Sequence, residues 1–165
     1  MLHLCDANVL ITASNTYYPL DQVPEFWAWI VHQGALGNIK LPLEILEEVL
    51  AGGKKDDPLL DWVNANKGVL QLAEAVDVAL VQTVVTKGYA PDLTDDELEE
   101  IGRDPFLIAY ALAAPNRCIV TTEVSKPGKK RQNRKVPDVC NDLGVTCHNP
   151  FTIYRNLGFN TKWQA

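Results

Sequence analysis

After Met1 the chain reads Leu2-His3-Leu4-Cys5-Asp6-Ala7-Asn8-Val9-Leu10-Ile11. The mostly apolar residues before Asp6 predict a buried strand, and the helical spacing of the apolar residues after it predicts a helix. Asp6 should therefore stand at the carboxyl end of a strand, the edge at which ligands bind in open α/β sheets. A carboxylate there is costly to desolvate unless it is paired or holds a cation. We therefore expect other charged groups to meet Asp6 at this edge.

Strand and helix patterns alternate along the rest of the chain. Further strands are predicted over residues 38–41, 117–121 and 145–147, and a short strand is an option near residues 69–72. Helices are predicted over residues 24–33, 43–50, 58–62, 74–87, 94–101, 106–113 and 151–157, with a short one from Pro137, and loops over 14–19, 52–57, 88–91 and 122–135. Thr94 and Glu97 fit a capping box, and the helix after Asp104-Pro105 is apolar on all sides, so it belongs in the middle of the domain. The alternation predicts one domain over residues 1–165, a layered α/β fold around a parallel sheet.

Composition excludes several classes of protein. With 47% hydrophobic and 22% charged residues, the chain is neither disordered nor fibrous. It has no apolar run of the roughly 18–20 residues that a membrane span needs and no signal-peptide pattern, so we expect a cytoplasmic protein without a membrane partner. The net charge of −6 argues against a uniformly basic surface, but residues 126–135 contain six basic residues and no acid. One basic segment is thus attached to an acidic body.

The four cysteines contain no Cys-x-x-Cys pair, so neither a zinc ribbon nor a redox motif is indicated. Zinc ligation by Cys140, Cys147 and His148 is the alternative to buried thiols, and buried thiols are favoured.

Four acidic positions share one placement, either just after a strand or early in the helix that follows it. They are Asp6, Glu48 (or Glu47), Asp104 and Glu123, with Asp138 as a fifth candidate. Parallel strands would direct all of them to one edge, and clustered carboxylates need a counter-charge. Mg²⁺ and Mn²⁺ favour such oxygen ligands. The alternatives are a helix N-cap for Asp104, a first-turn acid favoured by the helix dipole for Asp138, and solvated surface for the glutamates.

These motifs resemble the PIN domain family. Asp6-Ala7-Asn8-Val9-Leu10-Ile11 is similar to the family's opening aspartate motif, and Asp104-Pro105-Phe106-Leu107-Ile108-Ala109 to its central aspartate. Val120-Thr121-Thr122-Glu123 resembles its Val-Thr-x-Asp signature, with glutamate in place of aspartate. Ala7 stands where a hydroxyl residue is common. The tail from Val136 to Cys140 resembles an uncharacterised PIN-like branch.

The resemblance implies a single-domain three-layer α/β/α fold and a metal-dependent ribonuclease. Mg²⁺ or Mn²⁺ would be held by Asp6, Asp104 and Glu123, with Glu48 completing the catalytic acids. Asn8 and Thr121 would orient the carboxylates, and Lys129, Lys130, Arg131 and Arg134 would bind the RNA backbone. Tyr17 and Tyr18 are candidates for stacking on bases or for packing. Because many PIN proteins are dimeric toxins blocked by a small antitoxin, an antitoxin protein and a second copy of the chain are the implied partners.

The sequence also bears on three functions other than the nuclease. A non-catalytic PIN-like module would bind RNA or a protein through the same cleft without binding metal. An aspartate-nucleophile phosphatase would need a second acid two residues after Asp6, where the chain has Asn8. A P-loop enzyme is excluded because the chain has no Gly-x4-Gly-Lys-Ser/Thr run.

Overall fold

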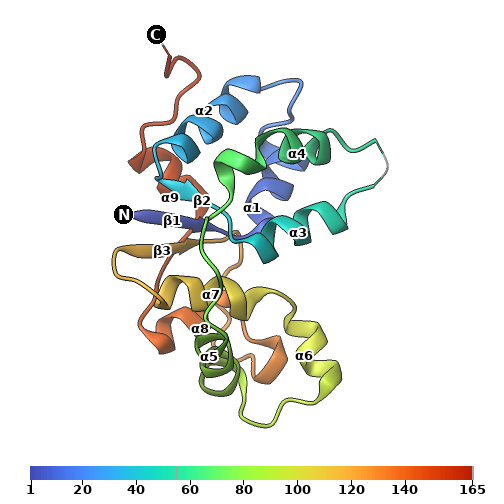
Figure 1. Ribbon diagram of the computed structural model, residues 1–165, viewed down its shortest axis with the longest axis vertical. Helices are drawn as coiled ribbons and strands as arrows, with labels where there is room; N and C mark the ends of the chain where they lie inside the picture. The colour runs from blue at the N-terminus through green and yellow to red at the C-terminus, as the bar shows by residue number, and fades with distance from the viewer. Residues whose placement is uncertain (55, 165) are drawn as a thin grey trace.

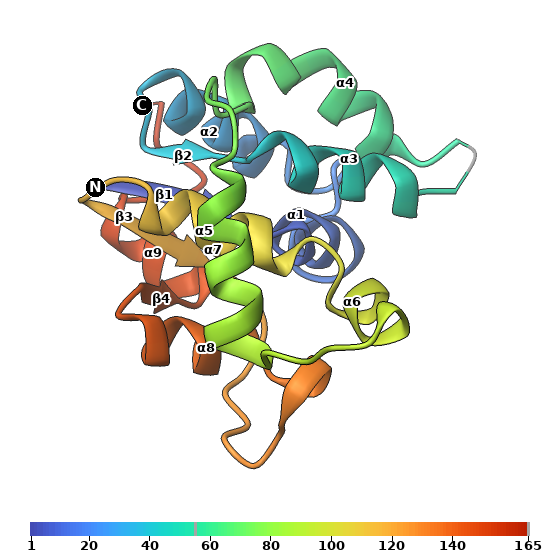
Figure 2. The ribbon, with the colours of Figure 1, turned by 60° about the horizontal axis from the view of Figure 1, so that its bottom comes forward.

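Four parallel strands form the central sheet, in the order β2-β1-β3-β4 (Figure 2). Figure 1 labels β1, β2 and β3. The computed structural model describes residues 1–54 and 56–164. Its strands are β1 (Leu2–Cys5), β2 (Ile39–Lys40), β3 (Arg117–Val120) and β4 (Thr146–His148). His3 of β1 is in register with Ile39 on one side and Cys118 on the other. From β1 the chain first crosses to β2 and later returns to β3 on the opposite side, so the crevice expected at such a reversal lies between β1 and β3.

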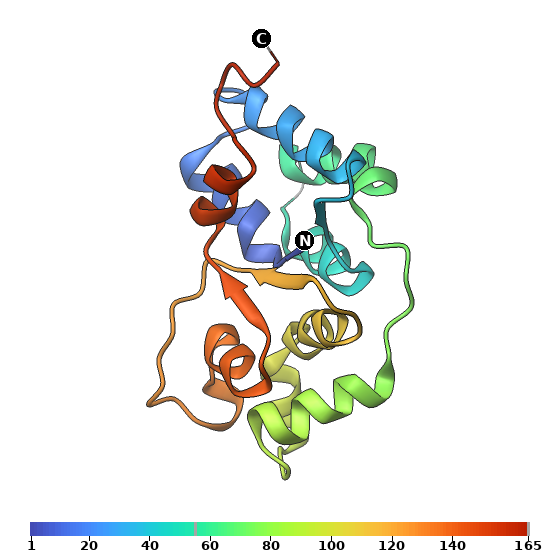
Figure 3. The same cartoon turned by 90° about the vertical axis from the view of Figure 1, so that its left-hand side faces the viewer.

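Helices cover both faces of this sheet (Figure 3). On one face lie α1 (Ala7–Thr12), α2 (Pro24–Ala35) and α9 (Pro150–Asn156). On the other lie α5 (Val78–Thr83), α7 (Asp104–Leu112) and α8 (Val136–Leu143). Helices α3 (Leu43–Gly52) and α4 (Pro58–Leu70) lie beside β2, and α6 (Asp95–Ile101) precedes α7 (Figure 2). The predicted three-layer α/β/α fold with a central parallel sheet is confirmed.

Burial of apolar side chains explains why helices α2 and α7 form where the sequence predicts them. Pro24 opens α2, which buries Phe26, Trp27 and Trp29. Tyr18 stacks on Phe26 with ring centroids 4.2 Å apart. Helix α7 is apolar on all sides and buries most of its residues, as predicted, because it packs against β3 and is covered by neighbouring helices.

Two local predictions were wrong, and a third falls partly outside the described residues. Residues 69–70 continue α4 instead of starting a strand, because Asp57 caps that helix and no proline interrupts it, and only Gln71 forms a parallel bridge, to Leu41. The loop predicted over 14–19 begins as a π-helical turn, Ala13–Tyr17, which extends α1. Lys55, in the turn predicted over 52–57, lies outside the described residues.

The helix predicted over 74–87 also differs. It begins at Val78, where Asp77 caps two backbone N–H groups, and α5 buries none of its residues. It continues as a π-helical turn, Val84–Tyr89, whose Val84, Gly88 and Tyr89 are buried. The apolar composition predicts burial, but this helix lies at the outside of its layer. The capping box of Thr94 and Glu97 is confirmed.

No helix within the described residues is long and apolar enough to cross a membrane.

Gly88→Ala is expected to lower the free energy of unfolding, whereas Gly68→Ala raises it. A Cβ at Gly88 would lie 2.6 Å from Val139 Cγ1, and such overpacking costs about 1–3 kcal/mol. A Cβ at Gly68, inside α4, meets nothing within 4 Å, so the better helix propensity should add roughly 0.5–1 kcal/mol. Urea unfolding of both variants checks this. Equal stabilities would mean that α8 shifts to make room.

Candidate functional site

Asp6 lies at the end of β1, where the sheet changes direction. Its backbone N–H donates to Val120 O at 2.9 Å, which fixes it against β3. Its carboxylate is 4% exposed and accepts hydrogen bonds from Thr121 Oγ1 at 2.7 Å and from Asn8 Nδ2. Burial raises the pKa of Asp6, and the bond from Thr121 acts against that. Asn8 and Thr121 therefore hold this carboxylate in place, the role predicted for them.

Asn8 also joins the two central strands. Its Oδ1 accepts a hydrogen bond from the backbone N–H of Thr122 at 2.9 Å, and its Nδ2 donates to Thr121 Oγ1 at 3.0 Å. The side chain thus links the start of α1 to the residues that follow β3, on either side of the crevice.

Asp104 is the acid that the negative charges of the other three all affect. Burial, followed by repulsion from Asp6, Glu123 and Glu48, holds the pKa of Asp104 well above its ordinary value. The cap position of α7 is taken by Arg103, and no side-chain cap bond forms there, so the N-cap interpretation of Asp104 is wrong. The four predicted acids therefore converge from four separate segments of the chain.

Helix α3 offers two neighbouring glutamates, and they point in different directions. The pKa of Glu48 is raised by desolvation and by repulsion from Asp6, while Arg103 lowers it. Glu47 instead faces Arg103, with Oε2 3.7 Å from the guanidinium and 54% of its side chain exposed. Glu48 is thus the glutamate that faces the acidic site.

Glu123 is held by two donors from the start of α8. Its Oε1 accepts from Lys135 Nζ at 2.8 Å, and its Oε2 accepts from the backbone N–H of Val136 at 2.8 Å. The hydrogen bond to Glu123, and attraction to Asp104, raise the pKa of Lys135. The sequence placed Lys135 only in the basic segment, so its contact with the acids was missed.

The donor set suits a hard divalent cation, but no finished ligand cage is present. Within residues 1–54 and 56–164, no group of three or more His, Cys, Asp or Glu side chains is arranged to hold a metal. That includes Cys140, Cys147 and His148, and all four cysteines are free thiols. Burial, followed by repulsion from neighbouring acids, nevertheless raises the pKa of Asp104 and of Glu48, so negative charge accumulates at the site. Oxygen ligands of this kind fit Mg²⁺ or Mn²⁺.

Asp138 belongs to the scaffold of the basic loop. Only 8% exposed, it accepts hydrogen bonds from Ser125 Oγ and from the backbone N–H of Lys126, the latter at 2.8 Å. This first-turn acid of α8 therefore fixes the loop that follows Glu123.

The four predicted RNA-binding residues divide into two pairs. Arg131 is bound to Glu97 at 2.6 Å and to Asp92 at 2.7 Å. The hydrogen bond from Arg131 lowers the pKa of Glu97 to about 2. Arg134 is bound to Asp142 and to Gly88 O. Lys129 and Lys130 are exposed and have no acidic partner among the described residues. Only the two lysines therefore remain available for a phosphate backbone.

Tyr89 is a site neighbour that the sequence did not indicate. It ends the π-helical turn after α5 and is 7% exposed, and its hydroxyl lacks a hydrogen-bond partner in the described part of the chain. Burial, followed by the negative charge of Asp104, raises its pKa, so it stays a protonated donor beside the acids. Short π-helical turns recur at functional sites. The sequence Gly88-Tyr89-Ala90-Pro91, however, predicts only the end of a helix, so it gives no sign of Tyr89.

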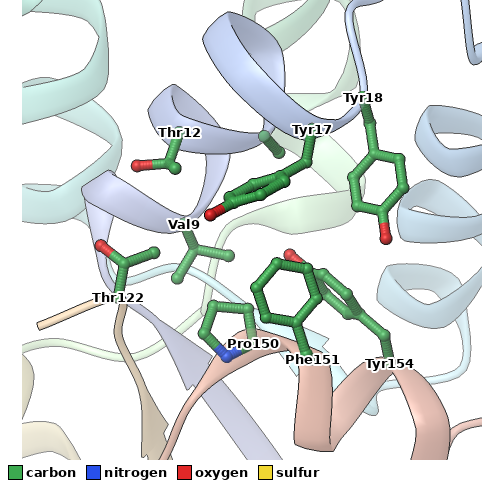
Figure 4. Close-up of a pocket in the computed structure, with 9 residues that line it drawn as sticks. Val9, Thr12, Tyr17, Tyr18, Thr122, Pro150, Phe151 and Tyr154 are labelled. Carbon is green, nitrogen blue, oxygen red and sulfur yellow. The ribbon is translucent and has the colours of Figure 1, made fainter. Parts of the chain in front are cut away.

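A small aromatic cavity adjoins the site at Thr122 (Figure 4). Its volume is about 10 Å³, enough for one water molecule and too small for a base. Tyr18 is packed on Phe26, whereas Tyr17 is 52% exposed and meets Phe151 edge-on with centroids 4.9 Å apart. Of the two tyrosines, only Tyr17 is accessible for stacking.

A family model described as "Domain of unknown function (DUF4411)" matches residues 3–161. No curated protein and no solved structure matches the chain.

Proposed function

The chain belongs to the DUF4411 family, and we propose that it is a Mg²⁺- or Mn²⁺-dependent ribonuclease that hydrolyses RNA phosphodiester bonds. The observation that carries the proposal is the convergence of Asp6, Glu48, Asp104 and Glu123 at the carboxyl edge of the sheet, where burial and the charges of the other three acids raise the pKa of Asp104. A partly buried cluster of like charges costs stability and is retained where it holds a cation. The resemblance to PIN domains supports the same reading.

In this proposal each group has a defined task. Asp6, Asp104 and Glu48 hold the ion, and Asn8 and Thr121 keep the Asp6 carboxylate turned toward it. The ion, when bound, activates a water for in-line attack and stabilises the charge on the leaving oxygen.

The basic loop supplies the contacts to RNA. Lys129 and Lys130 bind the phosphate backbone, and exposed Tyr17 stacks on a base. Activity as the toxin of a toxin–antitoxin pair, with an antitoxin partner and a homodimer, is the biological role proposed from the PIN resemblance.

Cleavage of end-labelled single-stranded RNA by the purified protein tests this function, with Mn²⁺, Mg²⁺ or EDTA present. Cutting should require the divalent ion. Glu48→Gln should lower kcat/KM about 10-fold or more, because a ligand charge is lost. Glu47→Gln, a change of the same kind one residue away, should leave the rate unchanged, because Glu47 faces Arg103. Equal effects of the two changes would place the metal elsewhere.

A second candidate is a non-catalytic module that binds RNA or protein through the same edge. Two observations favour it: Lys135 already neutralises Glu123, and the described residues form no closed three-ligand group. Calorimetric titration with Mn²⁺ decides between the candidates. RNA binding without any metal binding would favour the module, and metal binding with ion-dependent cutting would favour the nuclease.

A further inference from the structure

Lys135 occupies a position inside the acidic site. Its Nζ lies 2.8 Å from Glu123 Oε1, and the next residue's N–H binds the other oxygen of the same carboxylate. The side chains of Lys135 and Glu123 are only 35% and 23% exposed. This is therefore a partly buried pair that a backbone N–H at the start of α8 also holds, so solvent screens it less than a fully exposed surface pair.

The ammonium group of Lys135 acts on the part of the site that contains Glu123 and Asp104. It attracts Asp104 as well as Glu123, and it opposes the rise in the pKa of Asp104. The cation that acts on the pKa of Glu48 is Arg103, which pairs with Glu47 at 3.7 Å. The four acids thus divide into a side between Asp104 and Glu123, where Lys135 is hydrogen-bonded to a carboxylate, and a side between Asp6, Asp104 and Glu48, where the acting cation pairs with Glu47 instead.

We propose that Lys135 is a built-in cation that replaces a second metal ion, so that the site binds a single divalent ion. The inference rests on the proposed metal-dependent function. Paired catalytic ions stand about 3.5–4 Å apart and share a carboxylate between them. An ammonium in contact with Glu123 and close to Asp104 takes the place that the second ion would need and repels a cation placed there.

The stoichiometry of Mn²⁺ binding to the full chain, measured by calorimetry and by electron paramagnetic resonance, tests this assignment. The wild type should bind one ion. Lys135→Met removes the charge and keeps a long side chain, so it should bind two. Lys135→Arg keeps the charge and should bind one. Lys162→Met, at an exposed lysine, is the matched control and should also bind one.

A double variant identifies the second position. Lys135→Met combined with Glu123→Gln should return to one ion, because the freed carboxylate is the ligand of the added metal. Circular dichroism of each variant establishes that it is folded, and an unfolded Lys135→Met would be replaced by Lys135→Gln in the same comparison.

The outcomes separate this inference from the function on which it rests. Two ions in the wild type, or one in folded Lys135→Met, would overturn the role of Lys135 while leaving a metal site in place. Two ions in the double variant would overturn it too. No ion in the wild type would remove the metal-dependent function and the inference together.

Discussion

Asp104→Asn is expected to lower metal-dependent RNA cleavage roughly 100- to 1,000-fold, the range seen when one preorganised electrostatic contact is removed from an active site. Asp104 is the acid whose pKa is affected by Asp6, Glu123 and Glu48 together, so in the proposed function it is the shared ligand at the centre of the site. Asparagine keeps the shape of the side chain and removes its charge. The loss should therefore come from metal binding and catalysis while the fold is retained.

Initial rates on end-labelled RNA at saturating Mn²⁺ measure this loss. Asp95→Asn, which changes an exposed acid in the first turn of α6, is the matched control and should cut at the wild-type rate. Full activity in Asp104→Asn would show that a contaminating nuclease or a different site does the cutting.

The same substitution should make the metal-free protein more stable. Burial and repulsion in the folded state hold the pKa of Asp104 well above its ordinary 3.8, so at pH 7 this carboxyl group opposes folding. Removing this charge should raise the free energy of unfolding by about 1–3 kcal/mol, the usual cost of a buried polar group that lacks full compensation. The cost is complete above the folded-state pKa and decreases as the pH falls, because the folded protein then binds the proton more readily. The difference between variant and wild type should thus vanish near pH 4.

Added Mn²⁺ should make the wild type more stable than the Asp104→Asn variant. An ion that binds only the folded wild type stabilises it by about 2.7 kcal/mol at a free concentration 100 times its Kd, and the variant lacks this gain. Urea unfolding at pH 7 and pH 4, in EDTA and in Mn²⁺, gives all the values needed. A variant less stable than the wild type in EDTA would mean that the Asp104 carboxylate stabilises the fold.

The sequence predicted the parts of the site that follow strands or open helices. Asp6 could be placed because a short apolar run ends at it, and Asp104 because a proline and a fully apolar helix follow. Both signals are local, since periodicity and helix-start residues act within a few positions.

What the sequence could not predict depends on contacts between distant segments. Glu47 and Glu48 differ by about 100° around one helix, and only the packing of α3 selects Glu48. The partners of Arg131 and Lys135 lie 34 and 12 residues away, so no pattern within the basic segment distinguishes them from the free Lys129 and Lys130. The exposure of α5 is likewise a property of its place in the layer.

The ion pair between Arg131 and Glu97 closes a ring of chain, and both Asp104 and Glu123 lie inside that ring. Asp6 and Glu48 lie outside it. This ion pair is partly exposed, with 39% of the Arg131 side chain accessible, and exposed ion pairs weaken as salt is added. The half of the site that contains Asp104 and Glu123 is thus held by the packing of α7 and by Lys135, and the segment that carries it has one further tie at the surface. Ionic strength therefore acts on the contact that joins α6 to the basic loop.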